Sequence, residues 1–303
     1  MTGDEMSRDT EVLLELFFGE ATATEARVYV RAECERSADV RLTGTVWGPH
    51  STIARTLPAR LDLRDLGVDR EADRPPARLA EAILPDPCFW LPQRPYWYDV
   101  EIAVRRGDTP IVEVQRRLGI RPFGARGTDL LLEGRRWVMR GAVARSGDRR
   151  LAQTACREEV CLMIRDPSDE LLDEASRFGV LLVADFDHDP GDDGVAAQLE
   201  RLARWPAVAM TRLPAASDPR RWRRRPPRNL LLAQRFGPDD PVQVAPWAAV
   251  AVVEDHDPTR LARRTAGIGV PVVAVSLGVR PVGGGAIWRG CDSLQRTLVP
   301  HGD

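Results

Sequence analysis

Charged and imidazole side chains stand directly after several apolar runs in the second half of the sequence. They are Arg165 and Asp166 after VCLMI, Asp185, Asp187 and His188 at the end of VLLVAD and just beyond it, and Glu254, Asp255 and His256 after AAVAVV. Two carboxylates held close together can act as a general acid, a general base or a nucleophile. Carboxylate oxygens and imidazole nitrogens can instead bind a metal, here from Asp187, His188 and His256. A third interpretation is that these side chains cap helices and solvate loop ends.

Continuous apolar runs alternate with helical patterns after about Gly127, and these elements must position the polar residues. The expected strands are 160–164, 180–185, 207–213, 230–234, 248–253 and 270–277, with a short hairpin at 130–139 as the first element. The expected helices are 168–178, 194–204, 259–266 and 291–298. Apolar strands separated by helices are typical of a parallel sheet buried on both faces. Chemistry in such folds lies at the carboxyl ends of the strands.

The length of this second region limits how complete its barrel can be. About 175 residues follow Gly127, whereas a closed eight-stranded barrel usually needs ~250 residues and rarely fewer than ~200. Seven strands are expected, and two of the connecting helices are too short to see in the pattern. We therefore predict a reduced or incomplete (β/α) TIM-like barrel over residues 126–303. Because an exposed parallel edge invites association, we also expect a homodimer or a protein partner that covers this edge.

Alternating apolar and polar residues dominate the first part of the chain. ARVYVRAE at 26–33 and YDVEIAVR at 98–105 have the period of two that half-buried strands show. Further short strands are expected at 11–18, 40–47, 57–63, 80–84 and 111–118. Short strands with turns between them indicate an antiparallel immunoglobulin-like β-sandwich. We assign it residues 10–125, after a disordered tail at 1–9, so the fold class is multidomain β plus α/β.

The composition excludes several classes of function. All 43 basic residues are arginine, which excludes mechanisms that need a lysine, such as a Schiff base or a P-loop. The formal net charge of -2 gives no basic field for nucleic acid, and the cluster RRWRRR at 220–225 fits a solvated loop. The 5 cysteines lack CxxC spacing, which argues against a zinc site and a disulfide scaffold. We expect free thiols, no cofactor and no metal.

The amino-terminal residues MTGDEMSRDTE are acidic and polar, and the sequence contains no long apolar run. We therefore expect no signal peptide, no membrane segment and a cytoplasmic location.

A known family becomes recognisable where the two regions join. DPCFWLPQRPYWY at 86–98, LGIRPF at 118–123 and LLLEGRRWVMRG at 130–141 stand in succession. This succession resembles the junction of sandwich and barrel in glycoside hydrolase family 2, the family of β-galactosidases, β-glucuronidases and β-mannosidases. Residues at the matching positions are Trp90, Pro92, Pro95, Tyr98, Gly119, Arg121, Gly134, Arg140 and Gly141, with Glu133 in place of the usual asparagine.

The two catalytic glutamates that this resemblance implies are missing. A retaining glycosidase needs two carboxyl groups about 5–5.5 Å apart, one as acid/base and one as nucleophile. In the family the acid/base follows the fourth barrel strand in an Asn-Glu pair, and the nucleophile follows the seventh strand. Here TRLPA at 211–215 and SLGVR at 276–280 occupy those places and hold no carboxylate. We therefore predict a protein that is similar to this family, is inactive as a retaining glycosidase, and has a carbohydrate-binding or scaffolding role.

The alternative is an active glycosidase with relocated carboxylates. The third and sixth strands are as far apart around a barrel as the fourth and seventh, so Asp185 or Asp187 could work with Glu254 or Asp255. The substrate-binding candidates are polar residues and tryptophans near the same strand ends, namely Arg165, Asp166, His188, His256, Trp222 and Trp247. A carbohydrate is the expected ligand under either hypothesis, and we expect no nucleic-acid or membrane partner.

Overall fold

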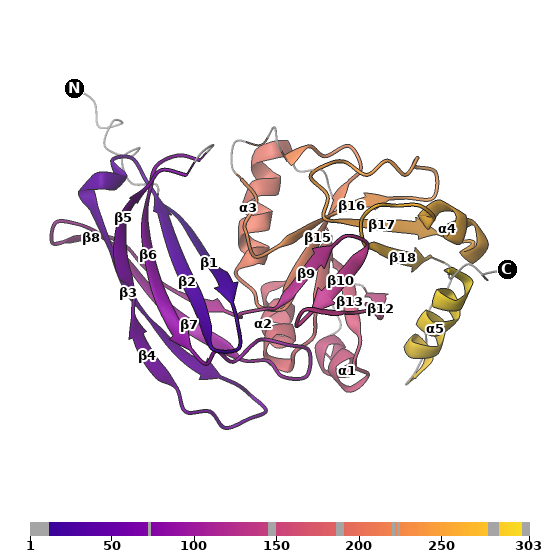
Figure 1. Cartoon of the computed structure of the whole chain (residues 1–303), viewed down its shortest axis with the longest axis horizontal. Helices are drawn as coiled ribbons and strands as arrows, with labels where there is room; N and C mark the ends of the chain where they lie inside the picture. The colour runs from indigo at the N-terminus through magenta and orange to yellow at the C-terminus, as the bar shows by residue number, and fades with distance from the viewer. Residues whose placement is uncertain are drawn as a thin grey trace. The chain divides into compact units, whose positions relative to one another are not determined.

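Two antiparallel four-stranded sheets form from the alternating segments of the first part of the chain (Figure 1). The structure is a computed structural model that describes residues 12–71, 74–144, 150–185, 191–219, 222, 225–277 and 285–298. One sheet has the order β1 (Leu13–Ala21), β2 (Glu25–Glu33), β6 (Ala77–Pro85) and β5 (Arg64–Asp69). The other has the order β4 (Ala59–Asp62), β3 (Val40–His50), β7 (Trp97–Arg106) and β8 (Thr109–Leu118).

A single hydrophobic core lies between these two sheets. It includes Val28 and Val30 from β2, Leu42 from β3, and Val100 and Ile102 from β7, each at most 2% exposed. Alternate residues of these strands point into the core because successive side chains of a strand face opposite ways. The predicted β-sandwich is therefore confirmed, and β5 is a strand that the sequence pattern did not indicate.

Tyr98 ties the start of β7 to the segment that precedes it. Its side chain is 2% exposed, and its hydroxyl oxygen accepts a hydrogen bond from the Cys88 backbone N–H at 2.9 Å. Burial raises the pKa of Tyr98 to about 12. Immunoglobulin-like sandwiches use a tyrosine in this way to hold a corner between strands.

Replacing Tyr98 with phenylalanine is expected to lower the free energy of unfolding by about 1 kcal/mol, because the Cys88 N–H loses its acceptor. The native pKa of Tyr98 lies above the unfolded value, so its contribution is complete below about pH 10 and is lost as the pH rises to about 12. Urea titrations at several alkaline pH values should show a shallower fall for Tyr98→Phe than for the unsubstituted chain. Equal slopes would contradict this assignment.

Contacts within the chain divide it into two compact units. The first ends at residue 120, and the second comprises 91–93 and the residues from 121 onward. The second unit opens with a small antiparallel sheet of β9 (Phe123–Arg126), β10 (Asp129–Leu132) and β11 (Arg135–Arg136). The hairpin expected at 130–139 belongs to this small sheet and not to the parallel sheet.

Seven parallel strands in consecutive order form the main sheet of the second unit. They are β12 (Gly141–Ala144), β13 (Cys161–Arg165), β14 (Leu182–Asp185), β15 (Val208–Pro214), β16 (Leu231–Phe236), β17 (Val250–Asp255) and β18 (Val272–Ser276). β12 and β18 stand at the two ends of this order, so the sheet is an open, partial barrel. The predicted partial barrel is confirmed together with six of its expected strands, and β12, which was not expected, takes the first place in the order.

Five helices accompany these strands in the described part of the chain. They are α1 (Leu151–Arg157), α2 (Asp169–Phe178), α3 (Gly191–Ala203), α4 (Pro258–Thr265) and α5 (Ala286–Leu298). α2 matches its predicted range: the Ser168 side chain accepts from the Leu171 N–H, and Gly179 ends the helix with a φ of 72°. The described residues hold no α-helix between β15 and β16 or between β16 and β17, where the sequence pattern also shows none.

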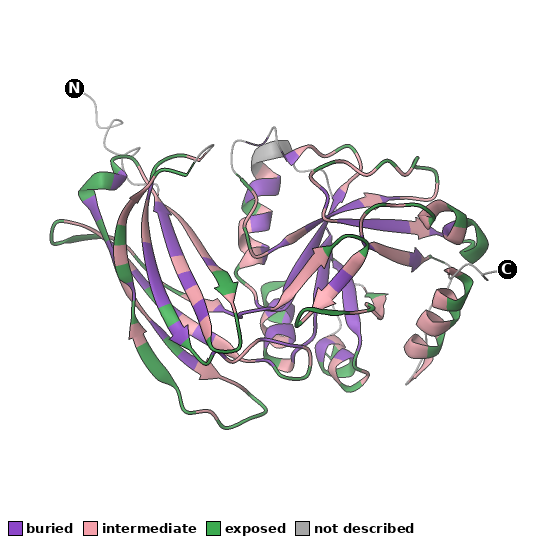
Figure 2. Cartoon of the chain, viewed as in Figure 1, coloured by how far each residue is buried: buried purple, intermediate pink, exposed green. Residues whose placement is uncertain are grey.

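Helix α5 links the two edges of the open sheet. Near β12, Arg140 pairs with Asp292 at 3.0 Å, and the Trp288 indole N–H donates to the Glu158 carbonyl at 2.5 Å. At its other end, Leu294 and Leu298 pack against the apolar cluster around β17 and α4. Figure 2 shows that α5 is only partly buried, whereas the central strands are largely buried.

The described residues contain no helix long and apolar enough to cross a membrane. All five cysteines are free.

Candidate functional site

The carboxyl ends of β13, β14 and β15 bring one carboxylate together with two guanidinium groups. Asp185 lies level with Arg165 on β13 and with Arg212 on β15 in the register of the sheet. Residues at the same level of neighbouring parallel strands point to the same face. Asp185, which is only 2% exposed, accepts from Arg212 Nη2 at 2.6 Å and lies 3.6 Å from Arg165 Nε.

Glu254 reaches the same guanidinium from β17. Its carboxylate accepts a hydrogen bond from Arg212 Nη1, while Arg235 on β16 donates to Asp185 at 3.2 Å. The Arg212 side chain is 5% exposed, and the Glu254 side chain is 15% exposed. Five adjacent strands, β13 to β17, thus contribute to one ion-pair network with Asp185 and Arg212 buried at its centre. We call Asp185, Arg212 and Glu254 the Arg212 bridge, because one guanidinium joins both carboxylates.

The Arg212 bridge unites the two strands on which relocated carboxylates were expected. It also fills the space between them with a guanidinium. A glycosidase places the substrate bond between its two carboxyl groups, one of which must donate a proton. In this structure, both carboxylates direct oxygen atoms to arginine N–H groups.

Asp255 points to the opposite face of the sheet, because it follows Glu254 directly along β17. Its carboxylate lies 3.1 Å from Arg264 Nη1 and 3.4 Å from Arg260 Nε, both on α4. Its Oδ1 atom also accepts from the Asp257 backbone N–H at 3.2 Å. Asp255 therefore fastens α4 to the sheet and does not join the Arg212 bridge.

The remaining described candidates differ in their exposure. Asp166 and His256 are exposed, and the Asp166 backbone N–H donates to the Asp185 carbonyl at 2.9 Å. Trp222 is 7% exposed, which leaves little ring surface for a ligand, and Trp247 is half-buried. Asp187 and His188 lie outside the described residues. Within the described ranges, no group of three or more His, Cys, Asp or Glu side chains could hold a metal ion.

Arg212 and Arg235 were not among the sequence candidates. The signal for Arg212 was present, since a charged residue inside the apolar run AVAMTRL needs a partner when the strand is buried. The sequence could not show which carboxylates would meet it.

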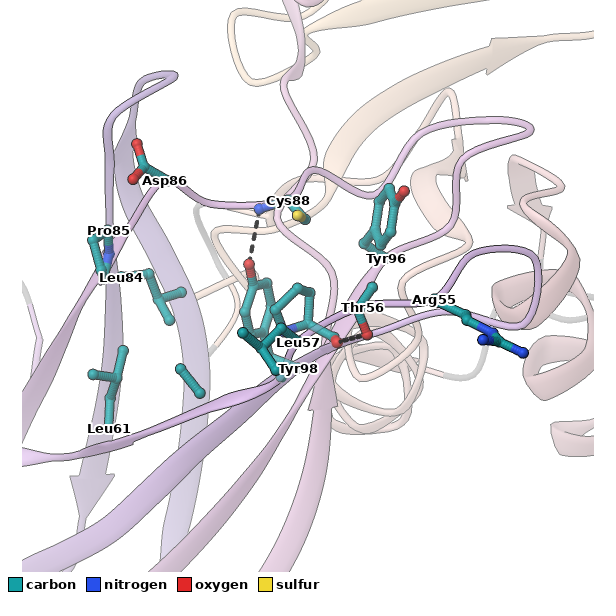
Figure 3. Close-up of a pocket in the computed structure, with 13 residues that line it drawn as sticks. Arg55, Thr56, Leu57, Leu61, Leu84, Pro85, Asp86, Cys88, Tyr96 and Tyr98 are labelled. Carbon is teal, nitrogen blue, oxygen red and sulfur yellow. Dashed lines mark hydrogen bonds between the residues drawn. The ribbon is translucent and has the colours of Figure 1, made fainter.

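A pocket of about 330 Å³ lies in the sandwich, between the segment after β3 and the segment after β6 (Figure 3). Its lining includes Leu61, Leu84 and Tyr98, which are apolar or already hydrogen-bonded. Figure 3 shows the charged ends of Arg55 and Asp86 extending away from Tyr96 and Tyr98, which also line the pocket. The Cys88 thiol also lines the pocket, but burial raises its pKa, which disfavours the thiolate that would act as a nucleophile.

Solved structures of glycosidases match most of the chain. A Bifidobacterium dentium β-glucuronidase complexed with coumarin-3-O-glucuronide is 13% identical with a TM-score of 0.63, and the match covers 94% of this chain and 57% of that one. A calcium-binding mutant of Bacteroides uniformis β-glucuronidase 2 is 15% identical with a TM-score of 0.58, covering 86% and 39%. A putative β-galactosidase from Bacteroides fragilis is 15% identical with a TM-score of 0.51, covering 81% and 42%.

The chain spans between about two fifths and three fifths of the length of these three proteins. No family model and no curated protein matches the sequence. At 15% identity or less, the structural matches concern the fold alone. One further match is described as a β-glucuronidase from glycoside hydrolase family 2, with a TM-score of 0.57. The chain therefore has a glycoside hydrolase family 2-like fold.

Proposed function

We propose that this chain is a non-catalytic relative of the glycoside hydrolase family 2 enzymes, with a carbohydrate-binding or scaffolding role. The observation that carries the proposal is the Arg212 bridge. Arginine stands in the fourth parallel strand near the place where the family has its acid/base, and it engages Asp185 and Glu254 together. A guanidinium cannot take part in the proton transfer of glycoside hydrolysis, because it stays protonated in proteins.

The alternative, an active glycosidase that uses Asp185 and Glu254, is favoured by one observation. The two carboxylates do converge on one face of the sheet. For catalysis, however, Arg212 would have to withdraw from a position that is 5% exposed, and a substrate would have to replace it. The proposal of a non-catalytic chain requires no such rearrangement.

Purified chain is expected to release no nitrophenol above the buffer rate from 4-nitrophenyl β-glucuronide, β-galactoside or β-mannoside. The physical reason is that no carboxylate of the Arg212 bridge is available as an acid or a nucleophile. Release of nitrophenol that Asp185→Asn or Glu254→Gln abolishes would establish the alternative. Retention of the chain by immobilised oligosaccharides would support the carbohydrate-binding role separately.

A scaffolding role draws support from the two edge strands. Val143 on β12 is 59% exposed and Leu277, just after β18, is 39% exposed, although most residues of the central strands are buried. The same proposal includes a second copy or another protein that covers an edge of the sheet. It also includes a cytoplasmic location. Sedimentation equilibrium of the purified chain measures whether a second copy binds.

A further inference from the structure

A group of aromatic and polar side chains lies on the outer face of the sheet that contains β3, β7 and β8. We call it the Trp47 face, and it consists of Trp47, His50, Trp97, Asp99 and Arg117. The neighbours of these residues along the strands, Val46, Tyr98, Val100 and Leu118, point into the sandwich core. Because side chains alternate along a strand, the Trp47 face points away from that core.

The aromatic rings of the Trp47 face contact one another. The centroids of Trp47 and His50 are 4.5 Å apart at an interplanar angle of 79°, and those of His50 and Trp97 are 6.1 Å apart. The Arg117 guanidinium lies 5.0 Å from the Trp97 ring centroid, within the range of a cation–π contact. These contacts hold the Trp47 indole in a defined orientation while leaving Trp47 48% exposed.

The charges around Trp47 balance in number, because two arginines, Arg60 and Arg117, lie near two carboxylates, Glu101 and Asp99. Arg60 on β4 contacts Glu101 at 2.6 Å and donates to the Thr45 hydroxyl at 3.1 Å. Asp99 lies 3.5 Å from His50 Nε2. A ligand can therefore bind this face without carrying a net charge. It does need polar groups that can form hydrogen bonds with carboxylate, guanidinium and hydroxyl groups.

We propose that the Trp47 face binds a neutral carbohydrate, with the C–H face of one pyranose ring stacked on the exposed indole of Trp47. A pyranose has an apolar face and a rim of hydroxyl groups, and the indole has an electron-rich face that attracts polarised C–H groups. The surrounding hydrogen-bonding side chains, Asp99, Arg60 and Glu101, match such a rim. This inference rests on the proposed carbohydrate-binding function and assigns it to the sandwich unit.

A purely apolar partner fits this face less well. One exposed indole among ion pairs is a small apolar surface, whereas docking surfaces for proteins have a contiguous apolar centre of larger area. The pocket of Figure 3 is the weaker sugar site, because its lining is mainly apolar and two of its charged side chains extend away from the tyrosines.

The test uses the full chain and isothermal titration calorimetry with cellohexaose, β-1,4-mannohexaose and β-1,4-galactan oligosaccharides as probes. Trp47→Ala is expected to weaken binding at least about tenfold, which corresponds to one aromatic stacking contact. Ile83→Ala is the matched control, because Ile83 is 41% exposed on β6 in the other sheet. It should bind as the unsubstituted chain does. Both variants should keep the thermal unfolding midpoint, since both side chains are exposed.

Three other results would contradict the inference, and they can be told apart. If the chain binds a probe and Trp47→Ala binds it equally well, the Trp47 face is not the site, while the proposed carbohydrate-binding function stands. If the unsubstituted chain binds none of the probes, the carbohydrate-binding function fails together with this inference. If Trp47→Ala changes only the oligomeric state in light scattering, the face is a protein interface.

Discussion

Replacing Arg212 with methionine is expected to lower the free energy of unfolding by about 3–5 kcal/mol. The substitution keeps much of the volume but leaves Glu254 without its guanidinium partner and Asp185 with one strong contact fewer. Removing one partner of a buried ion pair is costly because the remaining charge is buried without compensation. Urea denaturation of the purified variant, followed by circular dichroism, measures the change directly.

Arg165→Met is the control for this prediction. Arg165 also contacts Asp185, but at 3.6 Å and with a side chain that is 52% exposed. Solvent screens such a pair, so we expect a loss below about 1 kcal/mol. If Arg212→Met cost no more than Arg165→Met, the Arg212 bridge would not be a buried structural element and the case for a non-catalytic site would weaken.

Replacing Arg121 with methionine is expected to have a comparable effect, at the opposite ends of the strands. The Arg121 guanidinium donates to the carbonyl oxygens of Pro206 at 2.7 Å and Asn229 at 2.5 Å, and also to that of Val208. Burial lowers the pKa of Arg121 to about 10, so the group still carries its charge at neutral pH. Each buried carbonyl left without a donor costs about 1–3 kcal/mol, and we expect a total loss of about 3 kcal/mol.

Arg121→Lys separates charge from geometry at this position. A lysine ammonium can carry the charge but cannot present the planar fork that spans the starts of β15 and β16. We therefore expect Arg121→Lys to be intermediate between the unsubstituted chain and Arg121→Met in urea denaturation. Equal stability of all three proteins would show that the carbonyl groups find water or other donors.

Local sequence patterns predicted most of the elements. Period-two alternation located the strands of the sandwich, and Ser168 and Gly179 marked the two ends of α2. Short or weakly patterned elements were missed. The helix α1 has only seven residues, LAQTACR, and β5 lies in a charged segment whose pairing with β6 depends on the fold.

The missing glutamates were visible in the sequence, but the Arg212 bridge was not. Glu254 and Asp255 are neighbours with the same chemistry, yet one joins Arg212 and the other joins α4. Which of them faces the site depends on the register of β17 and on the face that α4 covers. The exposure of Trp47 could not be predicted from the sequence either, because it depends on which face of its sheet the Trp47 side chain occupies.

Covalent trapping by a 2-deoxy-2-fluoroglycosyl fluoride, read by intact mass spectrometry, distinguishes a non-catalytic chain from a retaining glycosidase. A retaining glycosidase displaces fluoride with a carboxylate and accumulates a glycosyl ester, because the fluorine at the 2-position slows its hydrolysis. The chain is expected to keep its unmodified mass with the glucuronyl, galactosyl and mannosyl reagents. A gain of one fluoroglycosyl group per chain, absent from Asp185→Asn or Glu254→Gln, would contradict this expectation.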